Sequence, residues 1–349
     1  MSSHIEVVKD ALEFKGPDYL PMEIVDVPGI YNAYHTLDPA TVQFIPGTEN
    51  FDSLWTNCYS WFHKEVGKTP EGETLKRDQF GTLIKIPLDT NSAYVVLERP
   101  LANKNSLAGY MFPNPDETDP YYEKLGSTIK EKYPDRFIDG YIDAGIFLTT
   151  MMLIGEEEFL VKTSDNINFV VEVYEAVMEY YKALALKYKK AGAHMITVIE
   201  DLGSTASLLI SPDIWRKHFK PLTAGFYKYM HEQGLYTGIF IDGNCGEILD
   251  DLLDMELDLF TTVDIKTTGL NLIKEKLKGK ICIKTSVDMQ TTLPLGTPEE
   301  VAKEAHELVA ALNSPEGGFI SYVLRWHRPE YPSANVLASA KAFNEYRKI

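Results

Sequence analysis

Residues 166–201, NINFVVEVYEAVMEYYKALALKYKKAGAHMITVIED, decide the fold because they join one long amphipathic helix to one buried strand. Within Asn166–Lys190, apolar side chains recur at three- and four-residue spacing and form a single stripe, which predicts a helix. The run His194–Asp201 is apolar in consecutive positions, which is typical of a strand buried on both faces. The stretch is therefore one helix–strand unit of a parallel sheet.

The same alternation of short strands and long helices runs through the chain from about residue 135 onward. The predicted strands are short apolar runs, most of which end in an acid: Pro21–Val27, Arg136–Asp143, His194–Asp201, Tyr236–Asp242, Leu257–Asp264, Lys280–Asp288 and Gly318–His327. An eighth strand has no clear place. A chain of 349 residues with this pattern predicts an α/β fold, a (β/α)8 TIM barrel of roughly 250 residues plus insertions.

Start and stop signals delimit the intervening helices. Ser164 or Asp165 can cap the long helix, and Gly192 follows its end. The run Ser211–Asp213 places a proline in the first turn of the next helix. Thr297–Glu300 opens a later helix in the same way.

Residues ~50–115 do not follow the alternation of strands and helices, because they are aromatic and rich in turn residues. A hairpin is predicted through Phe80–Arg99. We expect this N-terminal segment to be an insertion that covers one end of the barrel, within a single domain that spans residues 1–349.

The composition excludes several classes of protein. The formal net charge is −17, whereas nucleic-acid and anionic-membrane partners need a basic face. The three cysteines are too scattered for a disulfide framework or a structural zinc site. No signal peptide and no apolar run of about 20 residues is visible. We therefore expect a cytoplasmic protein.

Acidic residues end most of the predicted strands. In a parallel barrel the carboxyl ends of the strands converge on one opening, here called the mouth. The residues at these ends are Asp143, Glu200, Asp201, Asp242, Asp264, Asp288 and His327. Carboxylates held close together raise each other's pKa, so one of them can stay protonated and act as an acid. The alternative is that each acid caps the following turn, and for any one of them the two interpretations carry about equal weight.

Two motifs among these acids give more specific predictions. Glu200 and Asp201 are neighbours on a strand, so at most one of them points into the barrel unless the chain turns at Gly203. The run Asp242–Gly246 is a tight glycine-flanked turn before a helix at Glu247. Such a turn can aim N–H groups at an anion, or it can be an ordinary turn capped by its aspartate. Cys245 within it is interpreted as a small buried residue because no base adjoins it.

A third group lies on the last strand. Arg325 or Arg328 can bind a carboxylate with two hydrogen bonds, and His327 can serve as acid, base or metal ligand. The alternative is that these arginines only neutralise nearby acids. Tyr322 and Trp326 belong to the same run.

Two blocks of the sequence are especially specific, VIEDLG at 198–203 and LLISPDIW at 208–215. With them, nearly the whole chain resembles the uroporphyrinogen-decarboxylase superfamily, in particular its corrinoid-dependent methyltransferase branch. Further blocks follow in the order of the family: GPDYLPMEI, RDQFGTLIK, YIDAGIFLTTMMLIGEEEFL, FIDGNCGEILDDLLDMELDLF, GKICIKTSVDMQTTLPLGTPEEV and HRPEYPSANVLA.

Two departures narrow what the resemblance implies. The arginine-rich signature of the decarboxylases is absent from Pro21–Tyr31, which disfavours a porphyrinogen substrate. The His-x-Cys-Gly motif that holds zinc in the thiol-directed methyltransferases reads Phe240–Gly243, with Asp242 in place of the cysteine. The remaining resemblance is to enzymes that take a methyl group from a methyl ether, often an aromatic one, and give it to the Co(I) corrinoid of a partner protein.

On this resemblance Glu200, Asp242 and His327 are the catalytic candidates, as acids that protonate the leaving oxygen. Tyr141, Asp143, Asp201, Tyr322 and Arg325 are the predicted substrate-binding residues. The implied cofactor is a corrinoid carried by a corrinoid protein. Zinc held by Glu200, Asp242 and His327 is left open but not predicted, and so is a homodimer. The alternatives are a uroporphyrinogen-type decarboxylase, a methylcorrinoid:acceptor methyltransferase, and a binding protein without catalysis.

Overall fold

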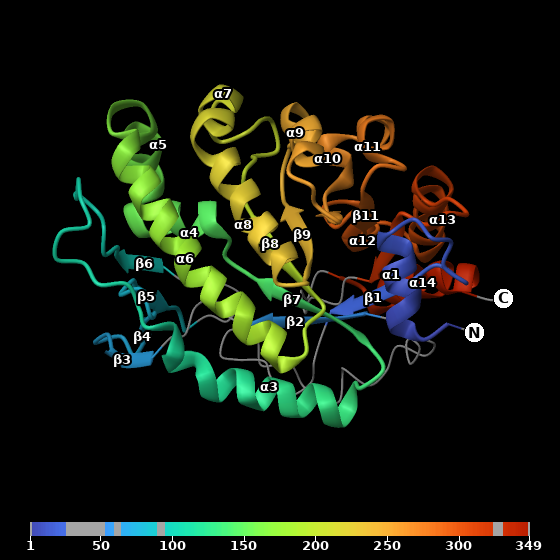
Figure 1. Cartoon of the computed structure of the whole chain (residues 1–349), viewed down its shortest axis with the longest axis horizontal. Coiled ribbons are helices and arrows are strands. Elements are labelled where there is room, and N and C mark those ends of the chain that lie inside the picture. Colours follow the sequence, from blue (N-terminus) through green and yellow to red (C-terminus); the bar gives the residue numbers. More distant parts are fainter. Residues whose placement is uncertain (1, 26–52, 59–63, 89–94, 324–330, 348–349) are drawn as a thin grey trace.

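The computed structural model of the chain describes residues 2–25, 53–58, 64–88, 95–323 and 331–347. Eight parallel strands form its centre (Figure 1). They are β1 (Met22–Val25), β2 (Ser53–Cys58), β7 (Phe137–Ile142), β8 (Met195–Glu200), β9 (Tyr236–Ile241), β10 (Leu259–Thr262), β11 (Cys282–Thr285) and β12 (Phe319–Val323). Their order is β1-β12-β11-β10-β9-β8-β7-β2, and the pairing of β1 with β2 closes the ring.

The prediction of an α/β fold built from parallel strands is confirmed, and each predicted strand contains an observed one. The strand that the sequence did not place is β2, which lies inside the segment predicted to be an insertion. Its sequence, SLWTNC, has neither a β-branched run nor a following amphipathic helix, so neither cue of a βα unit was present.

Helices connect and cover the strands. The α-helices are α1 (His4–Leu12), α3 (Asp119–Lys132), α4 (Ile146–Ile154), α5 (Glu156–Asp165), α6 (Ile167–Ala191), α7 (Pro212–Ile214), α8 (Lys220–Glu232), α9 (Leu249–Asp254), α10 (Ile265–Thr268), α11 (Leu270–Leu277), α12 (Thr292–Leu295), α13 (Pro298–Leu312) and α14 (Ser333–Asn344). A π-helical turn, η2 (Trp215–Phe219), leads into α8, and 3-10 turns lie at η1 (Pro115–Thr118), η3 (Gly246–Ile248) and η4 (Glu345–Arg347). No described helix is both long and apolar enough to span a bilayer.

The predicted helix boundaries are confirmed in part. Gly192 ends α6 in the left-handed conformation. Thr297 begins α13 with a reciprocal capping box to Glu300. The prediction that Ser164 or Asp165 caps α6 is wrong, because both belong to α5, which continues to the residue before Asn166.

A separate antiparallel sheet lies between β2 and β7 in the chain. Its strands are β3 (Lys64–Lys68), β4 (Thr74–Arg77), β5 (Leu83–Ile86) and β6 (Val95–Glu98), paired in that order. The predicted hairpin segment contains the antiparallel pair β5–β6. This sheet lies at the opposite end of the molecule from the two termini (Figure 1). That it covers an end of the barrel stays a prediction.

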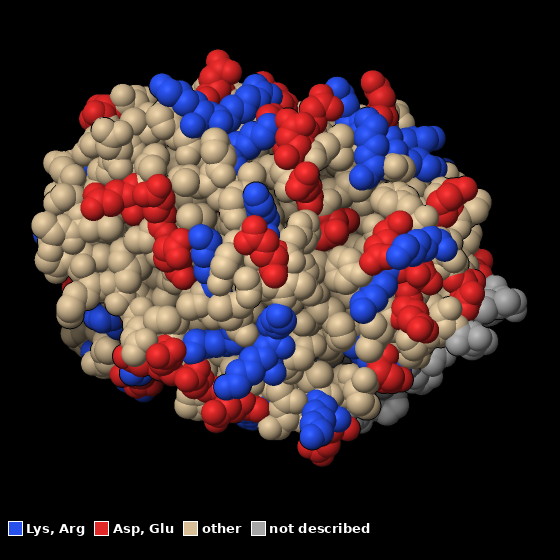
Figure 2. Space-filling view, viewed as in Figure 1, with Lys and Arg blue, Asp and Glu red and all other residues tan. Residues whose placement is uncertain are grey.

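Helix α1 closes the amino-terminal end of the barrel. Its residues Val8, Ala11 and Leu12 pack in one buried cluster with the side chains that begin the strands: Phe137, Met195, Leu259, Cys282 and Ile320. An apolar plug at this end leaves the opposite end, where the strands finish, as the place for polar chemistry. Most of the charged side chains lie at the surface, where acidic and basic residues are mixed (Figure 2).

Candidate active site at the strand ends

Contacts across the barrel identify the side chains that face its interior. Lys284 on β11 contacts Asp139 on β7, although three strands separate these two in the sheet. Such a contact can only cross the lumen. Thr197 on β8 donates a hydrogen bond to the same Asp139 carboxylate, at 2.9 Å, so Thr197 also faces inward.

Three of the predicted acids share this interior side. Asp143 and Asp201 each lie four residues beyond an inward-facing side chain of their own strand, and alternation returns them to the same face. Asp242 lies four residues beyond Gly238, the register partner of Thr197. These three residues, here called the strand-end trio, directly follow three neighbouring strands, β7, β8 and β9.

The members of the trio are partly buried. Burial raises the pKa of the Asp201 carboxyl above its ordinary value, which favours the protonated form. A raised pKa moves a carboxyl group towards the range that suits a general acid. The trio is therefore the part of the predicted acid cluster that lies on the interior side of the strands, and its role in catalysis or binding stays a prediction.

The prediction that Glu200 faces the mouth is wrong. Its side chain points outward from the last position of β8 and is 2 % exposed. The N–H groups of Ile146, Phe147 and Leu148, in the first turn of α4, donate to its carboxylate at 2.9 to 3.3 Å. Glu200 therefore caps a helix that follows a different strand, and the carboxylate is committed there.

Two opposing effects set the proton affinity of Glu200. Burial raises the pKa of its carboxyl to about 8, and the three N–H groups of α4 work in the opposite direction. Gly145, which precedes α4, makes this approach sterically feasible. A Cβ there would lie 2.5 Å from Glu200 Oε2 and 2.3 Å from the carbonyl oxygen of Ile199. The glycine and the glutamate thus form one structural unit.

Asp264 and Asp288 also lie outside the group of acids that faces the mouth. Asp264 is buried at the start of α10, one position out of phase with the inward-facing Thr261 of its strand. Asp288 accepts hydrogen bonds from the backbone of Thr291 and Thr292 and so caps α12. For Asp288 the capping interpretation describes the structure, whereas Asp264 stands at the N-cap position of α10 without a side-chain cap hydrogen bond.

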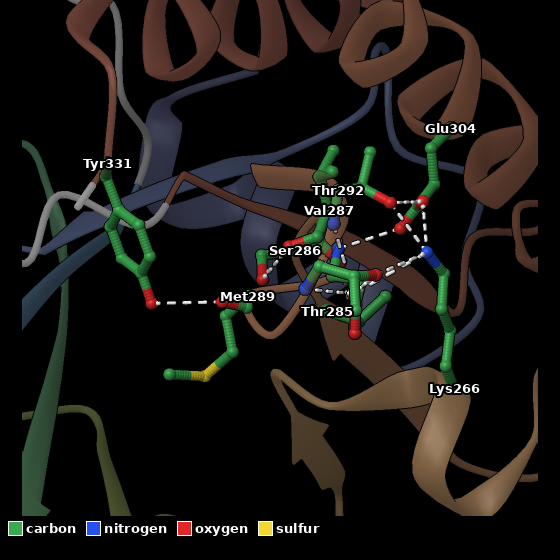
Figure 3. Close-up of polar contacts among 10 residues, drawn as sticks. Lys266, Thr285, Ser286, Val287, Met289, Thr292, Glu304 and Tyr331 are labelled. Atoms are coloured by element: carbon green, nitrogen blue, oxygen red, sulfur yellow. Dashed lines mark hydrogen bonds and ion pairs between the residues drawn. The ribbon is translucent and has the colours of Figure 1, made fainter. Parts of the chain in front are cut away.

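Lys266 braces the loop that contains Asp288. Its ammonium contacts Glu304 Oε2 at 2.9 Å, Thr292 Oγ1 at 2.6 Å and Asp288 Oδ2 at 3.5 Å. Figure 3 shows Lys266 reaching from α10 towards Glu304 and Thr292. These contacts join the loops after β10 and β11.

The turn Asp242–Gly246 is not an anion site. The N–H groups of Asn244, Cys245 and Gly246 donate to Ser204 O, Thr268 Oγ1 and Asn244 Oδ1 respectively. The turn packs closely against the preceding loop, since a Cβ on Gly243 would lie 2.3 Å from the carbonyl oxygen of Gly203. Both glycines are needed to bring the ends of β8 and β9 together.

The sequence also suggested that Asp242 caps the helix after this turn. In the structure the helical turn η3 follows, and Cys245, not Asp242, occupies its N-cap position. Burial raises the pKa of the Cys245 thiol to about 11, which agrees with its interpretation as a small buried residue.

Of the residues predicted on the last strand, the structure describes those up to residue 323. Arg325, Trp326, His327 and Arg328 lie outside the described residues. Tyr322 on β12 and Tyr141 on β7 both face the barrel interior, and each is 1 % exposed. Their substrate-binding role stays a prediction.

The sequence interpretation missed a charged cluster in the middle of the barrel. Lys284 Nζ lies 2.6 Å from Glu23 Oε1 and 3.1 Å from Asp139 Oδ2, and all three side chains are almost completely buried. We call these residues the interior triad. A signal was present, because each is a charged residue inside an otherwise apolar strand, in PMEIV, RFIDGYI and KICIKT. Charged residues are almost never fully buried unless paired, so three such strands imply mutual pairing.

Among the described residues, no three side chains of the metal-ligating kind lie together. The zinc site left open by the sequence included Glu200, whose carboxylate is held by α4 on the outer side of the barrel. Glu200 and Asp242 thus lie on opposite sides of the barrel wall, and a shared metal does not fit this arrangement.

The fold and the strand-end trio define a parallel α/β barrel with ionisable groups at the carboxyl ends of its strands, where barrel enzymes place their chemistry. The chain belongs to the uroporphyrinogen decarboxylase (URO-D) family, whose model matches residues 76–346.

The chain is similar in fold to a solved methyltransferase structure. A methyltransferase from Methanosarcina mazei is similar over 100 % of both chains, with a TM-score of 0.74 and 18 % sequence identity. A B12-independent methionine synthase from Shewanella sp. W3-18-1 is similar over 81 % of this chain and 75 % of that one, with a TM-score of 0.47 and 11 % identity. Among curated protein sequences, none matches the chain.

Proposed function

We propose that the protein is a methyltransferase that moves a methyl group from a methyl ether, aromatic in the first instance, to the Co(I) corrinoid of a partner protein. Family membership and the structural likeness to a methyltransferase support the general class. The observation that carries the proposal is the strand-end trio, which offers three carboxyl groups on adjacent strand ends. The proposal includes a cytoplasmic location.

An ether is a poor methyl donor because its leaving alkoxide or phenolate is basic. Protonating that oxygen while the carbon–oxygen bond stretches lowers the barrier, and a positioned acid contributes about 10²–10⁴-fold. Asp201 and Asp242 are the candidate acids on this proposal, with His327 as the third. Asp143 completes the polar edge on the neighbouring strand. Asp201 takes the role that the sequence suggested for Glu200.

The corrinoid belongs to the partner and supplies the nucleophile. This chain then has three tasks: to bind the donor, to orient its methyl group towards the partner, and to deliver a proton to the leaving oxygen. None of these tasks needs a metal ligand from the chain. A corrinoid protein must reach the mouth, so docking at the strand-end side is part of the proposal.

Mixing the pure protein with a reduced corrinoid protein and a methoxyarene should methylate cobalt, which absorbance reports. Asp201→Asn and Asp242→Asn should each slow the reaction, the true acid by about 10²–10⁴-fold. Asp213→Asn is the matched control, because its side chain is 96 % exposed. If no methoxylated or methylamine donor methylates cobalt, the proposal fails.

The family match makes a decarboxylase the second candidate. It predicts release of carbon dioxide from an acid substrate without any corrinoid protein. The absence of arginine from Pro21–Tyr31 weighs against a substrate with many carboxylates.

A further inference from the structure

Two members of the strand-end trio, Asp143 and Asp201, lie on either side of one junction between the ends of β7 and β8. Gly145, two residues after Asp143, donates its N–H to the carbonyl oxygen of Ile199 at 2.7 Å. Ile199 in turn precedes Asp201 by two residues. A backbone hydrogen bond thus joins the two short segments that carry these carboxyl groups, so their separation depends on how the junction is held.

Glu200 holds this junction from the outer side of the barrel wall. It lies between Ile199 and Asp201, and its carboxylate accepts N–H groups from the first turn of α4, which begins directly after Gly145. The side chain is buried, so these donors hold it in one direction. Neighbouring side chains of an extended chain point to opposite faces. Fixing Glu200 on the outer face therefore directs Asp201 to the interior face.

Helix α4 carries this restraint to the segment that contains Asp143. Thr149, one turn into the helix, donates its hydroxyl to the carbonyl oxygen of Ala144 at 3.0 Å, directly after Asp143. The other end of α4 is held as well, because Arg99 Nη1 donates to the carbonyl oxygen of Met152 at 2.8 Å. The helix is restrained at both ends, and its start fixes the segment before it.

We propose that Glu200 is a positioning residue, which fixes α4 against the end of β8 and thereby directs the Asp201 carboxyl group to the mouth at a set distance from Asp143. Glu200 itself lies outside the barrel wall and touches no substrate. A general acid must lie within hydrogen-bond reach of the leaving oxygen. Misplacement by about 1 Å can lower a rate by about 10²-fold. The orientation of this candidate acid is therefore decided outside the site.

Two routes connect Glu200 to Asp201, its charge and its position. The titratable groups around Glu200 are Asp201 on its own strand, Tyr174 on α6 and Tyr227 on α8, and α4 contains no charged residue. Burial raises the pKa of each tyrosine well above its ordinary value, so neither ionises near neutral pH. Two changes isolate the positional route: Glu200→Asp keeps the charge but withdraws it from α4, and Gly145→Ala alters no charge.

Carbon-13 NMR of labelled aspartate carboxyl groups tests the position of Asp201 in the whole folded protein without substrate. The Asp201→Asn spectrum assigns the resonance, because that variant lacks it. Burial raises the pKa of Asp201, so a carboxyl group that turns towards solvent should titrate at a lower pH. We expect Glu200→Asp and Gly145→Ala each to lower the titration midpoint of Asp201 by at least about 0.5 pH unit.

Each junction variant has a matched control. Glu304→Asp shortens a buried carboxylate that braces the loops after β10 and β11. Gly225→Ala adds a Cβ within α8 where nothing lies within 4 Å of it. Neither control should move the Asp201 midpoint. Unchanged midpoints in both junction variants would overturn the proposal, and should one of the two fail to fold, the midpoint of the other decides.

The consequence for methyl transfer rests on the proposed function. Glu200→Asp should lower kcat by at least about tenfold with little change in the KM for the donor, because a misplaced acid costs rate rather than binding. Added to Asp201→Asn, the same change should cost no more than about twofold, since the residue through which it acts is already gone. Full additivity of the two losses would overturn the role of Glu200 as a positioning residue for Asp201.

The NMR titration and the methylation assay fail independently. If cobalt methylation fails while the Asp201 midpoint shifts as expected, only the proposed reaction falls. If methylation succeeds and the midpoint stays at its wild-type value in both junction variants, only the positioning role falls.

Discussion

Glu200 and Asp139 are both completely buried carboxyl groups on adjacent strands, yet they lie on opposite faces of the barrel wall and are stabilised differently. Glu200 faces the helices, and its donors among the described residues are neutral N–H groups of α4. Asp139 faces the lumen and is paired with a lysine. The outer site fixes the position of a helix, while the inner site balances charge in the space that leads to the mouth. The comparison predicts that a cation matters more than helix dipoles to the stability of the barrel.

The largest effect is expected from Lys284→Met. This change removes the ammonium that contacts the two buried carboxylates, and breaking a buried ion pair costs about 3–5 kcal/mol of the free energy of unfolding. Urea unfolding at pH 7.5 measures it. The double variant Glu23→Gln/Lys284→Met should recover part of the loss. Wild-type stability in the single variant would show that the triad does not act as a charged unit.

Gly145→Ala should be the next most damaging change, because the new Cβ would meet the Glu200 carboxyl and a backbone oxygen. Overpacking of this kind costs about 1–3 kcal/mol. The matched control is Gly225→Ala within α8, where nothing lies within 4 Å of the new Cβ. The control should gain about 0.5–1 kcal/mol from helix propensity. Equal stability of both variants in thermal unfolding would argue against the close fit at Glu200.

Glu200→Gln should alter how stability depends on pH. The pKa of Glu200 is raised from 4.5 to about 8 in the folded chain, so the folded state binds more protons than the unfolded state between these values. Stability from this group is therefore complete below about pH 4.5 and is lost as the pH rises through 8, by at most about 1.4 kcal/mol per pH unit. The variant should flatten the decline measured by urea unfolding between pH 5 and 8. A slope identical to wild type would contradict this.

The smallest effect is expected from Thr297→Ala, which removes an exposed capping box at the start of α13. Loss of such a cap costs about 1 kcal/mol. It provides a reference for the buried cap that Glu200 supplies to α4, and its effect should not change between pH 6 and 8, because threonine does not titrate. Chemical unfolding at both values checks this.

Local patterns in the sequence account for much of the fold. The stripe of apolar residues located α6, Gly192 marked its end, and Thr297 with Glu300 marked the start of α13. The acids after β7, β8 and β9 were also recognised, although the expectation that Glu200 faces the mouth was wrong. The interior triad was missed because its members lie 116 to 261 positions apart in the chain, and only closure of the sheet brings them together.

The sequence by itself determined the order of helices and strands and the positions where most of them end, because periodicity, caps and turn residues act over a few neighbouring positions. Only the tertiary structure decided which side of each strand faces the lumen. A strand that is apolar on both faces has no alternating pattern, so its phase is set by how the sheet closes and not by its own residues. That one-residue choice of phase directs Glu200 to a helix and leaves Asp201 on the side of the mouth.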